Sequence, residues 1–489
     1  MVFSSAVFLF LFLPITVLVY YSPLCKAVRA KNGWLLLVSL GFYAWGEPIY
    51  ILLMLLSIAV NYVLGRCAEK TARTAQGRTV VVIACVYNLG VLFVFKYTAW
   101  ILRDVLQYDV TRTPFASLAL PIGISFYTFQ TLSYVIDVYR GSQKAQRNLL
   151  DAGLYIAFFP QLIAGPIVRY GTVSAMLLER THRFSDFSEG TRRFIIGLSK
   201  KLLIANNVAP VVYHAFNAGA AERSVLFAWV GAFAFTLQIY FDFSGYSDMA
   251  IGLGKMFGFH FLENFNYPYI SKSITEYWRR WHISLGQWFR DYLYYPLSTG
   301  AAVTLRKRLV GIAGRHGSGI IANAFVLLVV WLATGLWHGA NMTFVLWGLV
   351  QFVFILWEQY RKPLPQGRIA ACYAFVSTFL KILLAKVLFR ADTLLDAVGY
   401  YRSMLHLAGN GWTDEAGIYL LGQYKAFLLA GLVFCFPVAE KLHEWCAKKS
   451  VRAKTAYHAM TTLLLAALFV LDVSYAVSGS YNPFIYFNF

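Results

Sequence analysis

The chain has 489 residues, of which 59% are hydrophobic and only 13% are charged. A soluble fold of this length could not cover so much apolar surface with polar groups, so the composition predicts an all-α, polytopic membrane protein. It also excludes a disordered chain, a collagen-like chain and a disulfide-built secreted module. The net charge of +20 comes from short Lys/Arg clusters between apolar runs, which is typical of cytoplasmic loops beside anionic lipids and not of nucleic-acid binding.

The six cysteines form no recognisable metal-binding or disulfide pattern. None belongs to a CxxC pair, and most lie in or beside apolar segments. We therefore expect buried or juxtamembrane thiols, with no bound metal.

The first apolar runs predict helices with a turn between them. Residues 5–21 have spanning length and precede a basic cluster, so they are expected to form a first helix with the N-terminus outside. As one helix, residues 34–64 would measure about 46 Å at about 1.5 Å per residue, too long for a hydrocarbon core of about 30 Å. We expect two shorter helices that turn at Glu47 and Pro48 on the extracytoplasmic side.

The later apolar runs extend this topology. The run at 150–168 carries Pro160 and Pro166, which lack a backbone donor, so we expect it to enter the protein rather than to cross lipid. In total we expect about eleven to twelve transmembrane helices and both termini outside. The other crossing runs are 79–101, 115–138, 202–218, 225–254, 318–337, 343–359, 369–389, 423–437 and 458–477. We interpret 1–489 as one domain, with peripheral helices at 1–150, a core at 151–360 and C-terminal helices with a tail at 361–489.

The run at 225–254 contains two carboxylates where a membrane span should be apolar. Asp242 and Asp248 lie on either side of Ser244 in the sequence YFDFSGYSD. Ionisable residues at membrane depth are costly and often functional. They either order the bundle through an internal hydrogen-bond network or line a substrate path, and the sequence leaves both interpretations open.

Residues 264–282 are too polar to span and too aromatic for an ordinary loop. Spacing of four places Glu276 with Arg280 and Trp278 with His282, so we expect one amphipathic helix that pairs the ions and presents His282 on another face. An interfacial helix anchored by Trp and Arg would have the same pattern. The candidate site residues in this segment are Trp278, Arg279, Trp281 and His282.

A third polar group, Trp337-His338-Gly339-Ala340-Asn341, lies between two apolar runs. We expect His338 at the tip of a helical hairpin, where the adjacent glycine permits a tight bend. A buried histidine bonded to a carbonyl is one interpretation, and a neutral imidazole acting as a general base is the other. Trp337 and Asn341 are candidate tunnel residues.

Four segments resemble the membrane-bound O-acyltransferase family. They are LIAGPIVRY at 162–170, IYFDFSGYSDMAIGLGKMFGF at 239–259, WRRWHISLGQWFRDYLYYPL at 278–297 and TGLWHGANMTFVLWGL at 334–349. They are most similar to the bacterial branch that contains the membrane subunits of alginate and peptidoglycan O-acetylation. The resemblance covers nearly the whole chain and includes the tail YNPFIYFNF at 481–489.

This resemblance implies a helical fold around a tunnel, with His338 as the catalytic histidine and His282 as the second motif residue. It also implies acetyl-CoA as the acyl donor, no bound cofactor, and a periplasmic SGNH-hydrolase-like O-acetyltransferase as partner. The expected location is the bacterial inner membrane, in contact with its lipids. Tyr486 in the tail is either an interfacial anchor or, because a phenol hydroxyl can act as a nucleophile, an acyl relay.

Two other functions remain open from the residues alone. A proton- or ion-coupled transporter or flippase of an envelope precursor would use Asp242, Asp248 and Glu47 as ion sites. A structural scaffold for an envelope synthase would tolerate the loss of His338. Neither the polysaccharide nor the oligomeric state follows from the sequence.

Overall fold

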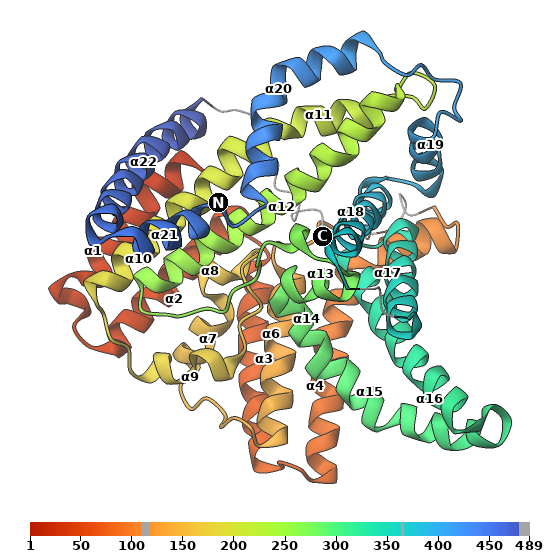
Figure 1. Cartoon of the computed structure of the whole chain (residues 1–489). Helices are drawn as coiled ribbons and strands as arrows, with labels where there is room; N and C mark the ends of the chain where they lie inside the picture. The colour runs from red at the N-terminus through yellow and green to blue at the C-terminus, as the bar shows by residue number, and fades with distance from the viewer. Residues whose placement is uncertain (110–112, 114, 116–117, 363–365, 479–489) are drawn as a thin grey trace.

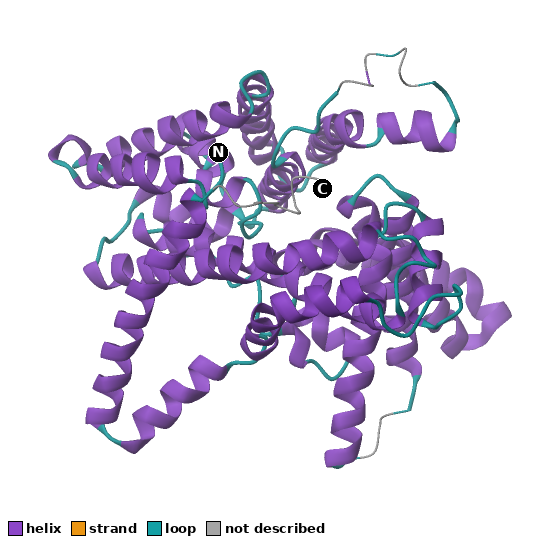
Figure 2. Ribbon diagram, turned by 90° about the horizontal axis from the view of Figure 1, so that it is seen from above, coloured by secondary structure: helices purple, strands orange, loops and turns teal. Residues whose placement is uncertain are grey.

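The computed structural model describes residues 1–109, 113, 115, 118–362 and 366–478. Every regular element among them is a helix, as Figures 1 and 2 show. This agrees with the all-α membrane architecture predicted from the composition.

In the N-terminal third, α3, α4 and α6 stand upright and lie side by side in Figure 1, whereas α1 and α2 lie to their left. The helices of this third are α1 (Leu13–Tyr21), α2 (Val28–Gly46), α3 (Ile51–Lys70), α4 (Ala75–Lys96), the short α5 (Thr98–Trp100) and α6 (Ile124–Arg140). The chain turns between α2 and α3 at Glu47 and Pro48, where two helices were expected. Glu47 Oε1 accepts a hydrogen bond from the Ile122 amide at 3.2 Å, which ties this turn to the loop before α6.

The middle of the chain contains both long and short helices. They are α7 (Leu149–Ala157), α8 (Phe159–Leu162), α9 (Tyr170–Leu178), α10 (Phe184–Ser199), α11 (Asn206–Asn217), α12 (Val225–Met256), α13 (Ile274–Arg280), α14 (Ile283–Phe289), α15 (Tyr295–Thr299), α16 (Ala301–His338) and α17 (Met342–Tyr360). A π-helical turn at Lys200–Ala205 joins α10 to α11, and a second one at Arg290–Tyr294 joins α14 to α15. α16 is broken at Gly314, whose φ is 66°.

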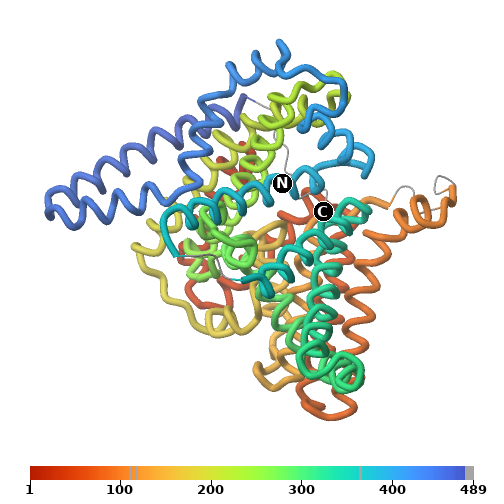
Figure 3. Tube along the Cα trace, turned by 45° about the vertical axis from the view of Figure 1, so that its right-hand side comes forward, coloured from red at the N-terminus to blue at the C-terminus, as the bar shows by residue number. Residues whose placement is uncertain are grey.

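The C-terminal helices surround this middle part. They are α18 (Arg368–Arg390), α19 (Leu394–Met404), α20 (Glu415–Phe434), α21 (Val438–Lys449) and α22 (Val451–Val477). In Figure 3 the α21–α22 hairpin projects from the side opposite α16. α22 packs on α10, and Asp472 is the one buried residue of this helix. The Asp472 carboxylate accepts a hydrogen bond from Ser199 Oγ at 2.7 Å.

Nine helical stretches in the described part of the chain are long and apolar enough to cross a membrane. They are Ile51–Lys70, Ala75–Lys96, Phe184–Asn217, Val225–Met256, Ile283–His338, Met342–Tyr360, Arg368–Arg390, Glu415–Phe434 and Val451–Val477. This is fewer than the expected number because some apolar segments form shorter helices. The apolar helix at Phe8–Tyr21 is one of these.

The segment at 150–168 enters the protein, as its prolines predicted. Nearly all of its residues are buried, in the short helices α7 and α8 and in the loop after them. Side-chain hydroxyls satisfy backbone groups that the irregular chain leaves open: Ser39 Oγ accepts from the Phe159 amide at 3.1 Å, and Ser284 Oγ accepts from the Ile167 amide at 3.0 Å. Irregular backbone at membrane depth is tolerated where protein supplies such partners.

Helices α10 and α12 approach each other closely at two pairs of glycines. A Cβ atom placed on Gly197 would lie 2.5 Å from the Gly245 carbonyl oxygen, and one placed on Gly252 would lie 2.5 Å from that of Gly190. Real Cβ atoms do not tolerate such distances, so only glycine permits this crossing. Small residues at helix crossings are the usual means of close packing within membranes.

We expect Gly197→Val to lower the free energy of unfolding by about 1–3 kcal/mol, because the added side chain overpacks a tight crossing. The midpoint temperature of thermal unfolding in detergent measures this loss. Gly90→Val is the matched control, since a Cβ at Gly90 in α4 meets no atom within 4 Å. Equal midpoints for the two variants would contradict the role assigned to this crossing.

Candidate active site

The α16–α17 hairpin places His338 in the protein interior. His338 is the last residue of α16 and is 2% exposed, at the hairpin tip that the sequence predicted. Its ring centroid lies 4.9 Å from that of Trp337, 5.1 Å from that of Trp347 and 5.2 Å from that of Phe389. The imidazole therefore lies in an aromatic enclosure built from α16, α17 and α18.

Glycines allow the two helices of this hairpin to approach. A Cβ on Gly335 would collide with the Phe344 carbonyl, and one on Gly348 would collide with the Trp331 carbonyl. A Cβ on Gly339 would overlap the Phe344 ring. The enclosure around His338 thus depends on the absence of side chains at these positions.

Asn341 stabilises the tip of the hairpin. Its Oδ1 accepts a hydrogen bond from the Thr343 amide at 3.0 Å, which makes it the N-cap of α17. Its Nδ2 donates to the Asp392 carbonyl at 2.7 Å. The side chain of this candidate tunnel residue is therefore engaged in fixing the start of α17 relative to the end of α18.

The prediction of one helix that includes His282 is wrong. α13 ends at Arg280 after seven residues, and His282 has a φ of 45°, in the left-handed region. The Ile283 amide donates to the Asn264 carbonyl at 2.9 Å, so pairing with a distant segment holds the chain in this break. The predicted Glu276–Arg280 ion pair does form, at 3.0 Å.

Asn264 determines which nitrogen of His282 carries the proton. The Asn264 side-chain oxygen accepts a hydrogen bond from the Ser284 amide at 3.2 Å, and the amide nitrogen donates to Ser247 Oγ at 3.1 Å. A backbone N–H can only donate, so the oxygen position is fixed by the network. His282 Nδ1 lies 3.1 Å from this oxygen and must therefore donate to it.

His282 consequently presents a lone pair at Nε2. This atom is buried and has no hydrogen-bond partner within the part of the chain that the structure describes. A neutral imidazole of this tautomer accepts, rather than donates, a hydrogen bond through Nε2.

Trp337 lies between the two histidines. Its ring centroid is 5.8 Å from that of His282 and 4.9 Å from that of His338. Phe126 of α6 and Phe243 of α12 also contact the His282 ring, at centroid distances of 6.4 and 4.6 Å. Residues predicted from two separate motifs therefore belong to one buried cluster.

The carboxylates of α12 are engaged in ion pairs rather than directed at this cluster. Asp242 pairs with Lys201 at 2.6 Å. Asp248 pairs with Arg193 at 2.7 Å and with Lys200 at 2.6 Å. Of the two interpretations that the sequence left open, these contacts favour the ordering network.

The other predicted residues divide between the cluster and its surroundings. Trp278 donates through Nε1 to Gln351 Oε1 at 3.0 Å, and its ring lies 5.7 Å from that of Trp347, which contacts His338. Trp281 is buried next to His282, whereas Arg279 is exposed. Ser244 is buried on α12, and its hydroxyl has no partner among the described residues. Tyr486 lies outside the described residues.

Sequence reasoning did not identify Lys96 and Lys386, which are buried around the cluster. Lys96 is 8% exposed and Lys386 is 4% exposed. Lys96 ends one apolar run and Lys386 shares another with Lys381, and a buried cation in such a run is itself a signal of function. The partner of His282, Asn264, was also not identified, because no sequence spacing relates it to Ser284.

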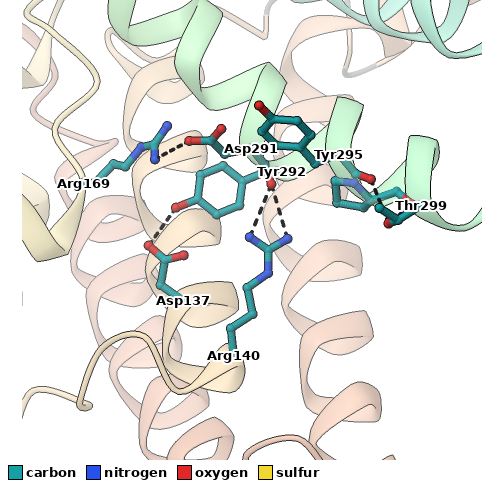
Figure 4. Close-up of a pocket in the computed structure, with 8 residues that line it drawn as sticks. Asp137, Arg140, Arg169, Asp291, Tyr292, Tyr295 and Thr299 are labelled. Atoms are coloured by element: carbon teal, nitrogen blue, oxygen red, sulfur yellow. Dashed lines mark hydrogen bonds and ion pairs between the residues drawn. The ribbon is translucent and has the colours of Figure 1, made fainter. Parts of the chain in front are cut away.

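A separate pocket of about 500 Å³ opens near the last turn of α6 (Figure 4). Its lining residues are Asp137, Arg140, Arg169, Asp291, Tyr292, Tyr295, Pro296 and Thr299. The Arg140 and Arg169 guanidinium groups lie 5.3 and 5.2 Å from the centroid of the Tyr292 ring. Arg169 also pairs with Asp291 at 2.7 Å.

Stacked aromatic rings connect this pocket to the histidine cluster. Tyr292 contacts Trp288 at a centroid distance of 5.2 Å, and Trp288 stacks on Phe129 at 3.9 Å. Phe129 in turn lies 5.8 Å from Trp337, the neighbour of His338. A continuous series of contacts therefore runs from this pocket to the candidate catalytic residues.

Comparison with known proteins gives this arrangement a family context. The family model described as MBOAT, membrane-bound O-acyltransferase family, matches residues 142–367. The chain is 41% identical to the probable alginate O-acetylase AlgI of Pseudomonas aeruginosa over 443 residues, which cover 89% of this chain and 81% of that protein. It is 30% identical to the peptidoglycan O-acetyltransferase of Helicobacter pylori, with 100% and 98% covered.

A more distant relative is the teichoic acid D-alanyltransferase of Bacillus subtilis, 29% identical over 269 residues, which cover 53% of this chain and 65% of that protein. Residues 142–367, which match the family model, contain His282, Trp337 and His338. Given this extent of identity and coverage, the chain belongs to the membrane-bound O-acyltransferase family.

Proposed function

We propose that this protein takes acetyl groups from a cytoplasmic thioester, acetyl-CoA, and passes them across the inner membrane of a bacterium for O-acetylation of an envelope polysaccharide. The buried cluster of His282, Trp337 and His338 carries this proposal, because it lies inside the segment that matches the family model. The names of the relatives, an alginate O-acetylase and a peptidoglycan O-acetyltransferase, support an acetyl group and an envelope glycan.

The positive-inside rule supports a cytoplasmic donor. A basic cluster at the end of α6 and just after it consists of Arg140, Lys144 and Arg147. A second cluster begins at Arg306, in the first part of α16. Short loops rich in Lys and Arg remain on the cytoplasmic side. On this topology the pocket lined by Arg140 and Arg169 faces the compartment that holds acetyl-CoA, and both termini lie in the periplasm.

The distance along α6 is consistent with a donor that reaches inward through a flexible arm. Ser125, at the start of α6, and Arg140, at its end beside the pocket, are 15 positions apart, or about 22 Å at about 1.5 Å per residue. The aromatic contacts from Tyr292 to Trp337 follow the same direction. A phosphorylated headgroup bound by Arg140 and Arg169 of this pocket would extend its pantetheine arm along these rings toward His338.

The two imidazoles have different tasks in this proposal. His338 removes the proton from the incoming hydroxyl, which then attacks the thioester carbonyl. His282 accepts a hydrogen bond from an N–H or O–H group of the substrate through its Nε2 lone pair and holds the reacting groups in place. The aromatic enclosure excludes water, which would otherwise hydrolyse the thioester.

The ion pairs of α12 do not fit a proton- or ion-coupled transporter or flippase. Such a protein would need a carboxylate that exchanges protons or ions. Asp242 and Asp248 are instead bound to Lys201, Arg193 and Lys200. Glu47 accepts a hydrogen bond from the Ile122 amide at the turn between α2 and α3.

Release of CoA from acetyl-CoA by the purified protein in detergent, supplied with a small alcohol as acetyl acceptor, tests the proposed donor. We expect the wild type to release CoA and His338→Ala to lower this rate by about 10²–10⁴-fold, because the general base is lost. The thermal midpoint should be unchanged. Normal turnover by the folded His338→Ala variant would remove His338 from the mechanism.

His282→Asn should retain part of the activity, since a carboxamide oxygen can still accept a hydrogen bond from the substrate. The rate of CoA release, compared with that of His282→Ala, measures this difference. Identical losses in the two variants would show that accepting a hydrogen bond is not the task of this residue.

Asn264→Ala should lower the rate of CoA release by about tenfold or more, because an unsatisfied buried donor on His282 costs about 1–3 kcal/mol. The alanine variant leaves the imidazole free to change tautomer. If activity in Asn264→Ala equals that of the wild type, the tautomer is irrelevant to the reaction.

The acetyl group also needs a route to the polysaccharide, and we assign this to a periplasmic SGNH-hydrolase-like transferase. Tyr486 is the proposed relay: its phenol oxygen accepts the acetyl group as an ester and passes it to that partner. Tyr486→Phe keeps the aromatic ring but removes the hydroxyl, so it should abolish polysaccharide acetylation while the protein accumulates normally. Acetate released by mild base from cell-surface polysaccharide is the readout. Wild-type acetylation would leave Tyr486 as a membrane anchor.

A further inference from the structure

Lys96 and Lys386 are two buried cations that the reaction scheme above does not use. Lys96 is the last residue of α4, and Lys386 lies near the end of α18. Both are within stretches long and apolar enough to cross a membrane. A buried ammonium group at that depth is costly, which makes an unexplained one informative.

Lys96 is directed at the backbone beside His338. Its Nζ donates to the Trp337 carbonyl at 2.5 Å and to Ser125 Oγ at 3.2 Å. The same ammonium lies 5.8 Å from the centroid of the Trp337 ring. The Lys96 ammonium group, at the end of α4, therefore lies next to the C-terminal end of α16.

Lys386 lies beside the other motif, the one that carries His282. Its Nζ lies 4.0 Å from the centroid of Trp281, the residue before His282, and 5.2 Å from that of Phe389. Phe389 is one of the rings that enclose His338. Each lysine thus contacts the tryptophan that precedes one of the two histidines.

Lys96 and Lys386 differ from the buried Lys201 in lacking an acidic partner. Lys201 pairs with Asp242, and Lys200 pairs with Asp248. No carboxylate within 4.0 Å of Lys96 or Lys386 is found in the residues that the structure describes. The cluster therefore has positive charge available for a negative group that arrives during the reaction.

We propose that Lys96 and Lys386 stabilise the negative charge that develops on the transferring acyl group. This inference rests on the proposed acyl transfer. The hydroxyl oxygen forms a bond to the thioester carbon, its proton moves to His338, and the carbonyl π electrons move onto oxygen. The ammonium groups stabilise that oxyanion. When the C–S bond breaks, the sulfur leaves with its electron pair and takes the proton from His338, and an ester remains.

Ammonium groups held in place by the fold are suited to this task, because they need little reorganisation when the oxyanion forms. Lys96 also has a structural alternative. Its bond to Trp337 lies at the C-terminal end of α16, where a cation stabilises the helix dipole. Loss of that bond alone would lower stability rather than turnover.

Substitution by methionine removes the charge and keeps the length of the side chain. We expect Lys96→Met and Lys386→Met each to lower kcat for CoA release by about 100-fold, the usual effect of losing one oxyanion donor, with KM nearly unchanged. Lys96→Arg and Lys386→Arg should recover a large part of the loss. Lys381→Met is the matched control on α18, because Lys381 lies 4.7 Å from the Trp357 ring, away from both histidines.

The outcomes separate this inference from the proposed donor. If the wild type releases CoA and both methionine variants keep its kcat, the lysines have no catalytic part. A fall in thermal midpoint with unchanged kcat assigns Lys96 to the helix end and overturns the proposal. If the wild type releases no CoA, acetyl-CoA is the wrong donor. The same variants are then compared by the base-released acetate of cell-surface polysaccharide, where undiminished acetylation at equal protein levels overturns the role of the lysines.

Discussion

The close crossing of α10 and α12 is the contact on which the rest of the molecule depends. Where Gly197 meets Gly245, the two backbones are near enough for Lys201 to reach Asp242 within the bundle. α12 then presents Phe243 to His282 and, through Ser247, holds Asn264. Without that approach the charges of α12 would be buried without partners, which costs far more than a lost surface ion pair.

Much of the architecture followed from composition and from local rules. The turn at Glu47, the buried segment with Pro160 and the hairpin tip at His338 all appear where the sequence predicted them. Each depends on neighbours in the chain: helix length, missing backbone donors, or a glycine after an apolar run. The ion pair of Glu276 with Arg280 is likewise local.

The candidate site was harder to predict because its geometry is non-local. His282 leaves the helical region because its neighbour pairs with Asn264, 18 positions earlier, and no periodicity reveals that contact. Lys96 and Lys386 come from helices far apart in sequence. Lys96 contacts Trp337 and Lys386 contacts Trp281 only in the folded chain. The paired state of Asp242 also required knowledge of how α10 packs.

The π-helical turn at Lys200–Ala205 has a consequence for how this chain can change in length. By widening the helix, the turn lets two consecutive lysines face the same neighbour, Lys200 toward Asp248 and Lys201 toward Asp242. Removing one residue here would replace the wide turn by regular α-helix and shift Lys200 and Lys201 relative to their carboxylate partners. Insertions and deletions should therefore disturb this turn, whereas the exposed residues around the break at Gly314 of α16 have room for them.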